Sequence, residues 1–384
     1  MKKKLVAIGL LFIFLCTLAT SVSAAEMNVV SPSAVLIDAQ SGKVLYGKEE
    51  HAVREPASVT KVMTMLLTLK AIEEGRITME DEVLISSYAA GIGGTQLFIE
   101  AGERRKVEEL FYGVAVESAN DAAVALGEHI GGSNEAFVAM MNEEAQRLGA
   151  VNTTFKNANG LTESGHVTTA YDIALMSMEL CRYENVFQYT STWMVDINIG
   201  KNNDKTRTLA NTNKLLKTDS AIDGLKTGYT SSSMYCISAT KKQGEMRLIA
   251  VVMGAPSIDE RSGDVLALFN YGFANFEGRY HVRAGQEFGE VSISRGEVKM
   301  IKAIAAEDIY EVVAKGGSAE VQIVPELEKN VKVPVEAGQK VGRVVVMSEG
   351  QEVGACDLIA QEGTGRVGFF SYIGRIIRSY FYIG

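Results

Sequence analysis

The spacing of hydrophobic side chains changes along the chain and divides it into regions of different secondary structure. Residues 33–50 alternate around an Ala-Gln-Ser-Gly turn and predict a hairpin, whereas segments between about 56 and 190 repeat apolar positions every three or four residues, as helices do. After about residue 220 alternating segments return, and residues 264–276 close this part with a helix. Strands, then helices, then strands predict an α+β domain, with an antiparallel sheet whose first and last strands meet and whose faces carry helices.

The pattern becomes β-like throughout after about residue 280. Short alternating segments separated by glycines predict a small all-β domain, a sandwich, over residues 279–365. We find no group of residues in it that indicates chemistry, and interpret it as a spacer or a protein-interaction module. The preceding domain is expected to span residues 25–278.

The first 24 residues have the pattern of an export signal. Three lysines at positions 2–4 precede an apolar run, and the small residues Val22 and Ala24 suit the positions before a cleavage site. An uncleaved anchor is the alternative. We expect export to the outer face of the cytoplasmic membrane or the cell wall space.

The last residues, 366–384, predict an amphipathic helix. Helical spacing gathers aromatic and aliphatic side chains on one side and places Arg375 and Arg378 on the other. The segment is short and carries two arginines, which argues against a span. It indicates a helix at the membrane surface, with its apolar face in the lipid. The alternative is a terminal helix packed on the protein itself.

Composition excludes several classes of function. The net charge is −9 and the pI about 5.2, so the chain lacks the basic surface that nucleic acid binding requires. Removing the signal would take three lysines and no acidic residue, leaving the mature chain more acidic still. The scattered histidines and cysteines indicate no zinc site and no disulfide framework, and we expect no metal and no cofactor.

The apolar spacing in segment 56–70 predicts an amphipathic helix with one apolar face toward the core, and a serine and a lysine stand three residues apart in it. Ser58 and Lys61 would share one face of a helix. A lysine that points toward a core is costly unless it has a use, and the alternative is that Lys61 reaches out to solvent. A second pair with this spacing, Ser238 and Lys241, lies in a strand pattern, where residues three apart face opposite ways.

Two further motifs indicate the kind of site to which the Ser58–Lys61 pair belongs. Ser118-Ala119-Asn120 is the only Ser-x-Asn sequence and Lys226-Thr227-Gly228 the only Lys-Thr-Gly sequence in the chain. Both follow Ser58, in the order and rough spacing of the serine enzymes that recognise penicillin. Ser238 is not followed by a Ser-x-Asn and then a Lys-Thr-Gly sequence, so we interpret it as a structural residue.

With these motifs the chain resembles the D-alanyl-D-alanine carboxypeptidases of the low-molecular-weight penicillin-binding protein family. The resemblance covers nearly the whole chain. It implies a β-lactamase/transpeptidase-like fold, an antiparallel sheet flanked by helices, followed by a small β domain. The stretches that carry it are REPASVTKVMT, ESANDAAVALGEHIGGS, FKNANGLTESGHVTTAYDIA, NTNKLL and DGLKTGYT.

The resemblance implies a role for each motif residue. Ser58 would be the nucleophile, and its own N–H would help to bind the oxyanion. Lys61 would be the base that takes the hydroxyl proton, and burial together with the cation of Lys226 would favour its neutral amine. Ser118 would relay a proton to the leaving amine. Asn120 would hold the substrate amide and orient Lys61.

The Lys-Thr-Gly segment would bind the end of the substrate. Lys226 and Thr227 would hold the terminal carboxylate, and Gly228 would let the substrate backbone lie close. The N–H of Tyr229 would supply the second oxyanion donor. Arg261, which matches a family arginine, is expected to support carboxylate recognition.

Three positions leave alternatives open or depart from the family pattern. Arg261 could instead be a surface arginine paired with Asp259 or Asp264. Ala119 stands where glycine is common, and we expect this change to be mild. Met234 stands where a small residue is usual, so the rim near the Lys-Thr-Gly strand is expected to differ.

The implied reaction has two steps. Ser58 attacks the penultimate D-alanine carbonyl of a peptidoglycan stem pentapeptide and releases D-alanine, and water then hydrolyses the acyl-enzyme, so that cross-linking is limited. β-Lactams would acylate the same serine. A class A β-lactamase would need a glutamate placed for deacylation, and a lipase-type hydrolase would need a Gly-x-Ser-x-Gly turn, which the chain lacks. A catalytically weak wall-binding or penicillin-binding protein is the remaining alternative.

Overall fold

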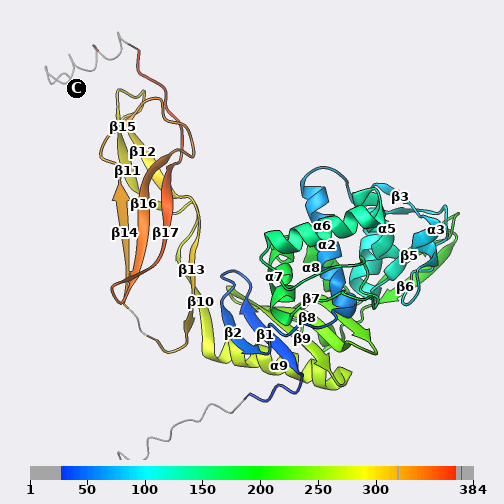
Figure 1. Cartoon of the computed structure of the whole chain (residues 1–384). Coiled ribbons are helices and arrows are strands. Elements are labelled where there is room, and N and C mark those ends of the chain that lie inside the picture. The colour runs from blue at the N-terminus through cyan, green and yellow to red at the C-terminus, as the bar shows by residue number, and fades with distance from the viewer. Residues whose placement is uncertain (1–26, 318–319, 369–372, 374–384) are drawn as a thin grey trace, which may run out of the picture.

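The computed structural model describes residues 27–317, 320–368 and 373 (Figure 1). The predicted export signal, and all of the predicted terminal helix except 366–368 and 373, lie outside these residues. Over the described ranges we find no helix whose length and apolar content would let it cross a bilayer.

A five-stranded antiparallel sheet forms the centre of the first domain. Its strand order, β2-β1-β9-β8-β7, places the first and last parts of this domain side by side, as predicted, because β1 pairs along its whole length with β9. The predicted hairpin is formed by β1 and β2. The strands are β1 (Ser33–Asp38), β2 (Val44–Lys48), β7 (Ile222–Thr230), β8 (Met234–Gln243) and β9 (Met246–Ala255).

Helices cover both faces of this sheet, because its central strands are apolar on both sides. Along β1, Val35 and Ile37 pack into the core beneath α2, α5 and α7, whereas Ala34 and Leu36 pack into a second core beneath α9. The helices are η1 (Ala57–Thr60), α2 (Lys61–Glu73), α3 (Ser87–Gly91), α4 (Val107–Tyr112), η2 (Gly113–Glu117), α5 (Asn120–Gly131), α6 (Asn134–Arg147), α7 (Ala170–Leu180), α8 (Val186–Thr190), η3 (Lys214–Lys217) and α9 (Ile258–Asn275).

Two short ribbons complete this domain, β3 (Glu82–Leu84) with β4 (Arg104–Lys106), and β5 (Met194–Ile199) with β6 (Lys205–Ala210). Helix α9 begins earlier than the predicted residue 264, because the Ser257 hydroxyl accepts the Glu260 N–H and caps the helix there.

Helix α2 is not amphipathic, and the prediction of one apolar face is wrong. All but three of its residues are buried, including the polar Thr64 and Thr68. The helix is surrounded by α5, α6 and α7 and by the sheet, so it has no solvent face along most of its length. Thr64 donates to the Ala158 carbonyl and Thr68 to the Thr64 carbonyl, which satisfies both hydroxyls inside the protein.

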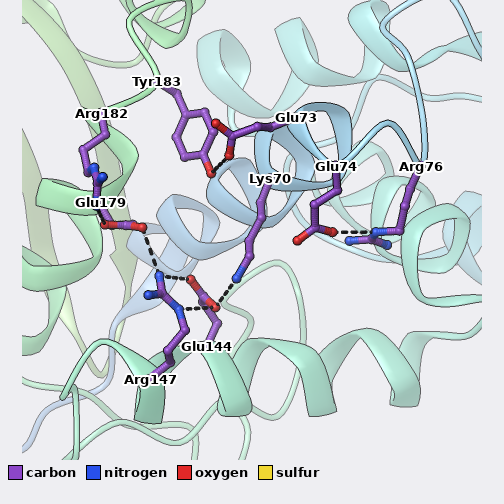
Figure 2. Close-up of polar contacts among 9 residues, drawn as sticks. All are labelled: Lys70, Glu73, Glu74, Arg76, Glu144, Arg147, Glu179, Arg182 and Tyr183. Atoms are coloured by element: carbon purple, nitrogen blue, oxygen red, sulfur yellow. Dashed lines mark hydrogen bonds and ion pairs between the residues drawn. The ribbon is translucent and has the colours of Figure 1, made fainter. Parts of the chain in front are cut away.

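The end of α2 is held by a cluster of ion pairs (Figure 2). Lys70 Nζ lies 2.7 Å from the Glu144 carboxylate of α6, which also pairs with Arg147 at 2.6 Å. Arg147 reaches on to Glu179 of α7 at 2.9 Å. This network ties α2, α6 and α7 together at the end of α2 that lies away from Lys61.

The second domain is a curled β sheet of strand order β14-β16-β17-β12-β11-β15. The strands β11 and β14 are distant in this order and yet contact each other, so the sheet folds over its own apolar core. An all-β domain is therefore confirmed. The strands are β10 (Phe276–Val282), β11 (Glu287–Ser294), β12 (Met300–Ala305), β13 (Ile309–Ala314), β14 (Val321–Leu327), β15 (Val331–Lys332), β16 (Lys340–Ser348) and β17 (Gln351–Ala360).

The two domains are joined through the ribbon of β10 and β13. Val312 of this ribbon belongs to the core beneath α9. Tyr310 donates to Asp38 at 2.9 Å, and Lys43 donates to the Val312 carbonyl at 2.9 Å. The boundary expected after residue 278 falls inside β10, so the predicted domain limits stay a prediction.

Candidate active site

The chain makes a sharp turn just before α2, and this turn places Ser58 beside Lys61. Ser58 lies in the short helix η1 and Lys61 is the first residue of α2. Ala57 adopts a φ of +48°, in the left-handed region that non-glycine residues rarely enter. Lys61 Nζ lies 3.1 Å from Ser58 Oγ. The two side chains that the motif predicted to be neighbours are therefore in contact.

Lys61 is fully buried and does not reach solvent, so that alternative is wrong. Its Nζ lies 2.7 Å from Asn120 Oδ1 and 2.6 Å from the Asn159 carbonyl oxygen. The amide of Asn120 is fixed in this orientation, because its Nδ2 donates to the Gly93 carbonyl at 2.7 Å.

These contacts orient the amine. A neutral amine has two N–H donors and one lone pair, and the two oxygens of Asn120 and Asn159 can only accept. In the neutral form these two oxygens use both donors, which leaves the lone pair for the Ser58 hydroxyl 3.1 Å away. The arrangement is one in which Lys61 can take a proton from Ser58.

Electrostatics favour the neutral form of this lysine. Burial lowers the pKa of Lys61 well below its usual range, and the nearby cation of Lys226 lowers it further. Asp121, which is buried and accepts the Leu97 N–H, opposes this shift more weakly. The pKa of Lys61 is therefore shifted downward, as we expect from the sequence.

Ser118 comes two residues before Asn120 but is not bonded to the serine–lysine pair. It ends the helix η2 with a φ of +70°, and Asn120 begins α5 two residues later. Among the described residues, the Ser118 hydroxyl makes no hydrogen bond with Ser58 or Lys61. Its part in proton transfer stays a prediction.

The Lys-Thr-Gly segment lies on β7, the edge strand of the sheet, and packs against η1. A Cβ built on Gly228 would lie 2.9 Å from Ser58 N and 3.0 Å from Val59 N. Only glycine therefore lets the strand approach the backbone of Ser58 so closely. Thr227 Oγ1 lies 2.6 Å from Thr212 Oγ1. Tyr229 follows on the same strand with an exposed ring.

Two basic side chains are buried here, Lys226 of β7 itself and Arg261 of α9. Lys226 Nζ donates to the Thr227 carbonyl at 2.8 Å. Burial and the charge of Arg261 lower the pKa of Lys226 to about 7. Arg261 is buried, and its Nε has no hydrogen-bond partner among the described residues. Because Arg261 is buried, the alternative that it is a surface arginine is wrong. Asp264, one of the partners suggested for it, instead accepts hydrogen bonds from the backbone N–H groups of Val30 and Ser31.

Sequence reasoning missed a chain of groups that supports the turn at Ser58. Lys156 N–H donates to His166 Nδ1 at 3.0 Å, which places the proton of the neutral ring on Nε2. That nitrogen lies 2.8 Å from Thr60 Oγ1, and Thr60 donates to the Ala57 carbonyl at 2.8 Å. His166 was only one of four scattered histidines in the sequence, and no spacing marked it.

The structure also locates Met234 and the second serine–lysine pair, Ser238 and Lys241. Met234 has a φ of +55°, a backbone conformation that suits glycine, so the departure noted in the sequence falls on a strained position. The second pair lies in β8, as its strand pattern predicted. There Ser238 Oγ contacts Ser177 Oγ at 2.7 Å, and Lys241 pairs with Asp219 at 2.6 Å.

A serine in contact with a buried lysine, with a Lys-Thr-Gly edge strand packed against it, is the arrangement that penicillin-recognising serine hydrolases share. Sequence comparison narrows this class. The sequence profile of the D-alanyl-D-alanine carboxypeptidase family matches residues 19–257, and that of the penicillin-binding protein 5 C-terminal domain matches residues 276–365. The chain belongs to the D-alanyl-D-alanine carboxypeptidase family and is a serine-type D-Ala-D-Ala carboxypeptidase, a hydrolase.

Individual relatives are similar to most of the chain or to a large part of it. The chain is 39% identical to the D-alanyl-D-alanine carboxypeptidase DacF of Bacillus subtilis over 97% of each chain. Among solved structures, it is similar to penicillin-binding protein 5 from Haemophilus influenzae, with a TM-score of 0.71 and 32% identity over 88% of this chain and 98% of that one. Penicillin-binding protein D2 from Listeria monocytogenes, solved with ampicillin bound, has a TM-score of 0.57 and 31% identity over 63% of this chain and 97% of that one.

Proposed function

We propose that Ser58 is the nucleophile of this carboxypeptidase and that neutral Lys61 is its base. The observation that carries the proposal is the set of three oxygens around Lys61 Nζ, which uses both N–H donors and leaves the lone pair for the Ser58 hydroxyl. Ser58 attacks the penultimate D-alanine carbonyl of a peptidoglycan stem pentapeptide. Terminal D-alanine leaves, its amine protonated through Ser118, and water then hydrolyses the acyl-enzyme.

The same geometry supports the binding of the substrate's end. The cations of Lys226 and Arg261, with the Thr227 hydroxyl, hold the terminal carboxylate. Gly228 keeps β7 against η1, so the N–H groups of Ser58 and Tyr229 can both face the developing oxyanion. One such donor typically contributes about 3 kcal/mol to lowering the barrier.

β-Lactams would react with the same serine. The relative from Listeria monocytogenes was solved with ampicillin bound, and this chain is similar to it in fold and sequence. We therefore expect penicillin to form a covalent adduct on Ser58.

The test is the release of D-alanine by the purified mature chain from a stem pentapeptide, with Ser58→Ala as the inactive variant. Ser238→Ala is the matched control, because it alters the other serine–lysine pair. The proposal predicts release by the wild type and by the control, and none by Ser58→Ala. Release by Ser58→Ala would contradict it. β-Lactam hydrolysis without D-alanine release would indicate a β-lactamase instead.

We also propose that the chain is exported and held at the outer face of the cytoplasmic membrane by its last residues. The support is the sequence pattern of residues 1–24 and 366–384, together with a family that acts on peptidoglycan. The expected domains between them are 25–278 and 279–365. Sedimentation with membranes tests the anchor: a chain that ends at Gly365 should stay in the supernatant. If the shortened chain sediments as the full one does, the anchor lies elsewhere.

A further inference from the structure

The loop of residues 155–166 lies against the turn that carries Ser58. The closest approach is made by Gly160, which has a φ of +85°. A Cβ on this glycine would collide with the Ala57 carbonyl and would lie 2.9 Å from Ser58 N. The loop therefore packs directly on the peptide unit that joins Ala57 to Ser58.

A buried histidine at the end of this loop reaches the same peptide unit. His166 is 2% exposed, and its ring packs edge to face on Phe155, with the ring centroids 5.8 Å apart. Its Nδ1 accepts the Lys156 N–H, and its Nε2 donates to Thr60 Oγ1, which in turn donates to the Ala57 carbonyl. Both ring nitrogens are therefore used, and two hydrogen bonds of 2.8 Å link the histidine to that carbonyl.

The peptide unit held in this way is the one whose N–H would bind the oxyanion. Because a peptide unit is planar and trans, the direction of the Ala57 carbonyl also fixes the direction of the Ser58 N–H. That N–H lies in the first turn of η1, where N–H groups have no partner within the helix. Ala57 has a strained φ of +48°, which persists only while its surroundings hold it. A peptide unit released from Thr60 is therefore expected to rotate.

We propose that His166 is a positioning residue for the acylation of Ser58: through Thr60 it holds the Ala57–Ser58 peptide unit so that the Ser58 N–H faces the developing oxyanion. This inference rests on the proposed function, in which Ser58 is the nucleophile. The buried histidine acts through the peptide unit and not on the substrate. Since the oxyanion forms only in the transition state, loss of this support should slow acylation without weakening the binding of the substrate.

Acylation of the purified mature chain by a fluorescent penicillin tests the proposal, because it separates the limiting rate constant from the half-saturating concentration. Thr60→Val removes the hydroxyl with almost no change in size, whereas Thr60→Ser keeps it. The matched control is Thr153→Val, since Thr153 is also buried and its hydroxyl contacts Thr168 and Asp172 instead of the turn.

The expected effect is confined to the rate constant. We expect Thr60→Val to lower it about 10- to 100-fold, because complete loss of one oxyanion donor costs about 100- to 1000-fold. The half-saturating concentration should stay unchanged. Thr60→Ser and the control Thr153→Val should react as fast as the wild type.

Two substitutions of the histidine separate its two ends. Asparagine places an amide oxygen near the position of Nδ1 and keeps the bond from Lys156, whereas glutamine places an amide nitrogen near that of Nε2 and keeps the bond to Thr60. We expect His166→Asn to react as slowly as Thr60→Val, and His166→Gln to stay near the wild type. The double variant Thr60→Val/His166→Asn should be no slower than either single variant, because both break the same chain of hydrogen bonds.

Each rate constant refers to the molecules that form an adduct, so partial unfolding of a variant does not change it. Equal rate constants for His166→Asn and His166→Gln would overturn the proposal, because the bond to Thr60 would then not matter for acylation. Slowing of Thr153→Val as strong as that of Thr60→Val would also overturn it. Adduct formation by Ser58→Ala would instead contradict the nucleophile itself, so the two failures are distinguished.

Discussion

Replacing Asn120 by Asp tests how the structure keeps Lys61 neutral. The Asn120 amide oxygen lies 2.7 Å from Lys61 Nζ, and its Nδ2 donates to the Gly93 carbonyl. Asn120→Asp places a carboxylate at nearly the same position, with no change in size. It also removes the donor to Gly93, so an oxygen faces an oxygen there.

The expected magnitude follows from the distance and the burial. Charge centres about 4 Å apart at an effective dielectric constant of about 20 interact by about 4 kcal/mol, which corresponds to about three pKa units. Carboxylates this close to a cation shift pKa values by about 1–3 units. The pKa of Lys61 should therefore rise by that amount, and the neutral fraction at a pH below it should fall about 10- to 1000-fold.

The assay is the rate at which a fluorescent penicillin acylates Ser58, measured by stopped flow from about pH 6 to about pH 10. Asn120→Ala is the control, because it removes the same acceptor without adding a charge. We expect the deficit of Asn120→Asp to shrink as the pH rises and that of Asn120→Ala to stay constant. Parallel pH profiles, or an Asp variant as fast as the wild type at neutral pH, would refute the reasoning.

Three further predictions concern charge and stability. Because the pKa of Lys226 is about 7 and its charged form binds the carboxylate, kcat/KM for the peptide should fall as the pH rises through about 7. The variant Lys226→Arg should lack this falling limb, and an unchanged limb would assign it to another group. Glu103→Gln breaks a fully buried ion pair with Arg105 and should lower the free energy of unfolding by about 3–5 kcal/mol, whereas Glu80→Gln breaks an exposed pair and should leave it nearly unchanged; equal losses in denaturant unfolding would contradict this. Burial lowers the pKa of His166 to about 4, so between about pH 6.5 and pH 4 the unfolded state binds the proton and the folded state does not. The wild type should therefore lose up to about 3 kcal/mol of stability over this window as the pH falls, a loss that is absent in His166→Gln, and equal acid sensitivity of the two would count against it.

The fold could be predicted where the spacing of hydrophobic residues in a segment identified its secondary structure. The alternation in residues 33–50 gave the hairpin of β1 and β2, and strands at both ends of the domain implied that β1 meets β9. Helix α2 was misjudged, because a helix enclosed by other helices is apolar all round and its polar Thr64 is satisfied by a distant carbonyl. Spacing within one segment carries no information on what packs around it.

For the site, the sequence predicted which motif residues lie close together, but not the other groups around them. Ser58, Lys61 and Asn120 meet as their order implied. The third oxygen on Lys61 belongs to the main chain of Asn159, and a main-chain carbonyl leaves no mark in the sequence. The same holds for His166, whose partners are a backbone N–H and the hydroxyl of a threonine far away in sequence.

The claim on which this account depends is that Lys61 is neutral beside Ser58. The most direct measurement is the NMR titration of lysine side chains labelled with ¹³C at Cε, with the Lys61 signal assigned by its loss in Lys61→Arg. The account predicts that Lys61 loses its proton well below the usual lysine value of about 10.4, while the exposed lysines are still charged. A Lys61 signal that titrates together with the exposed lysines would contradict it.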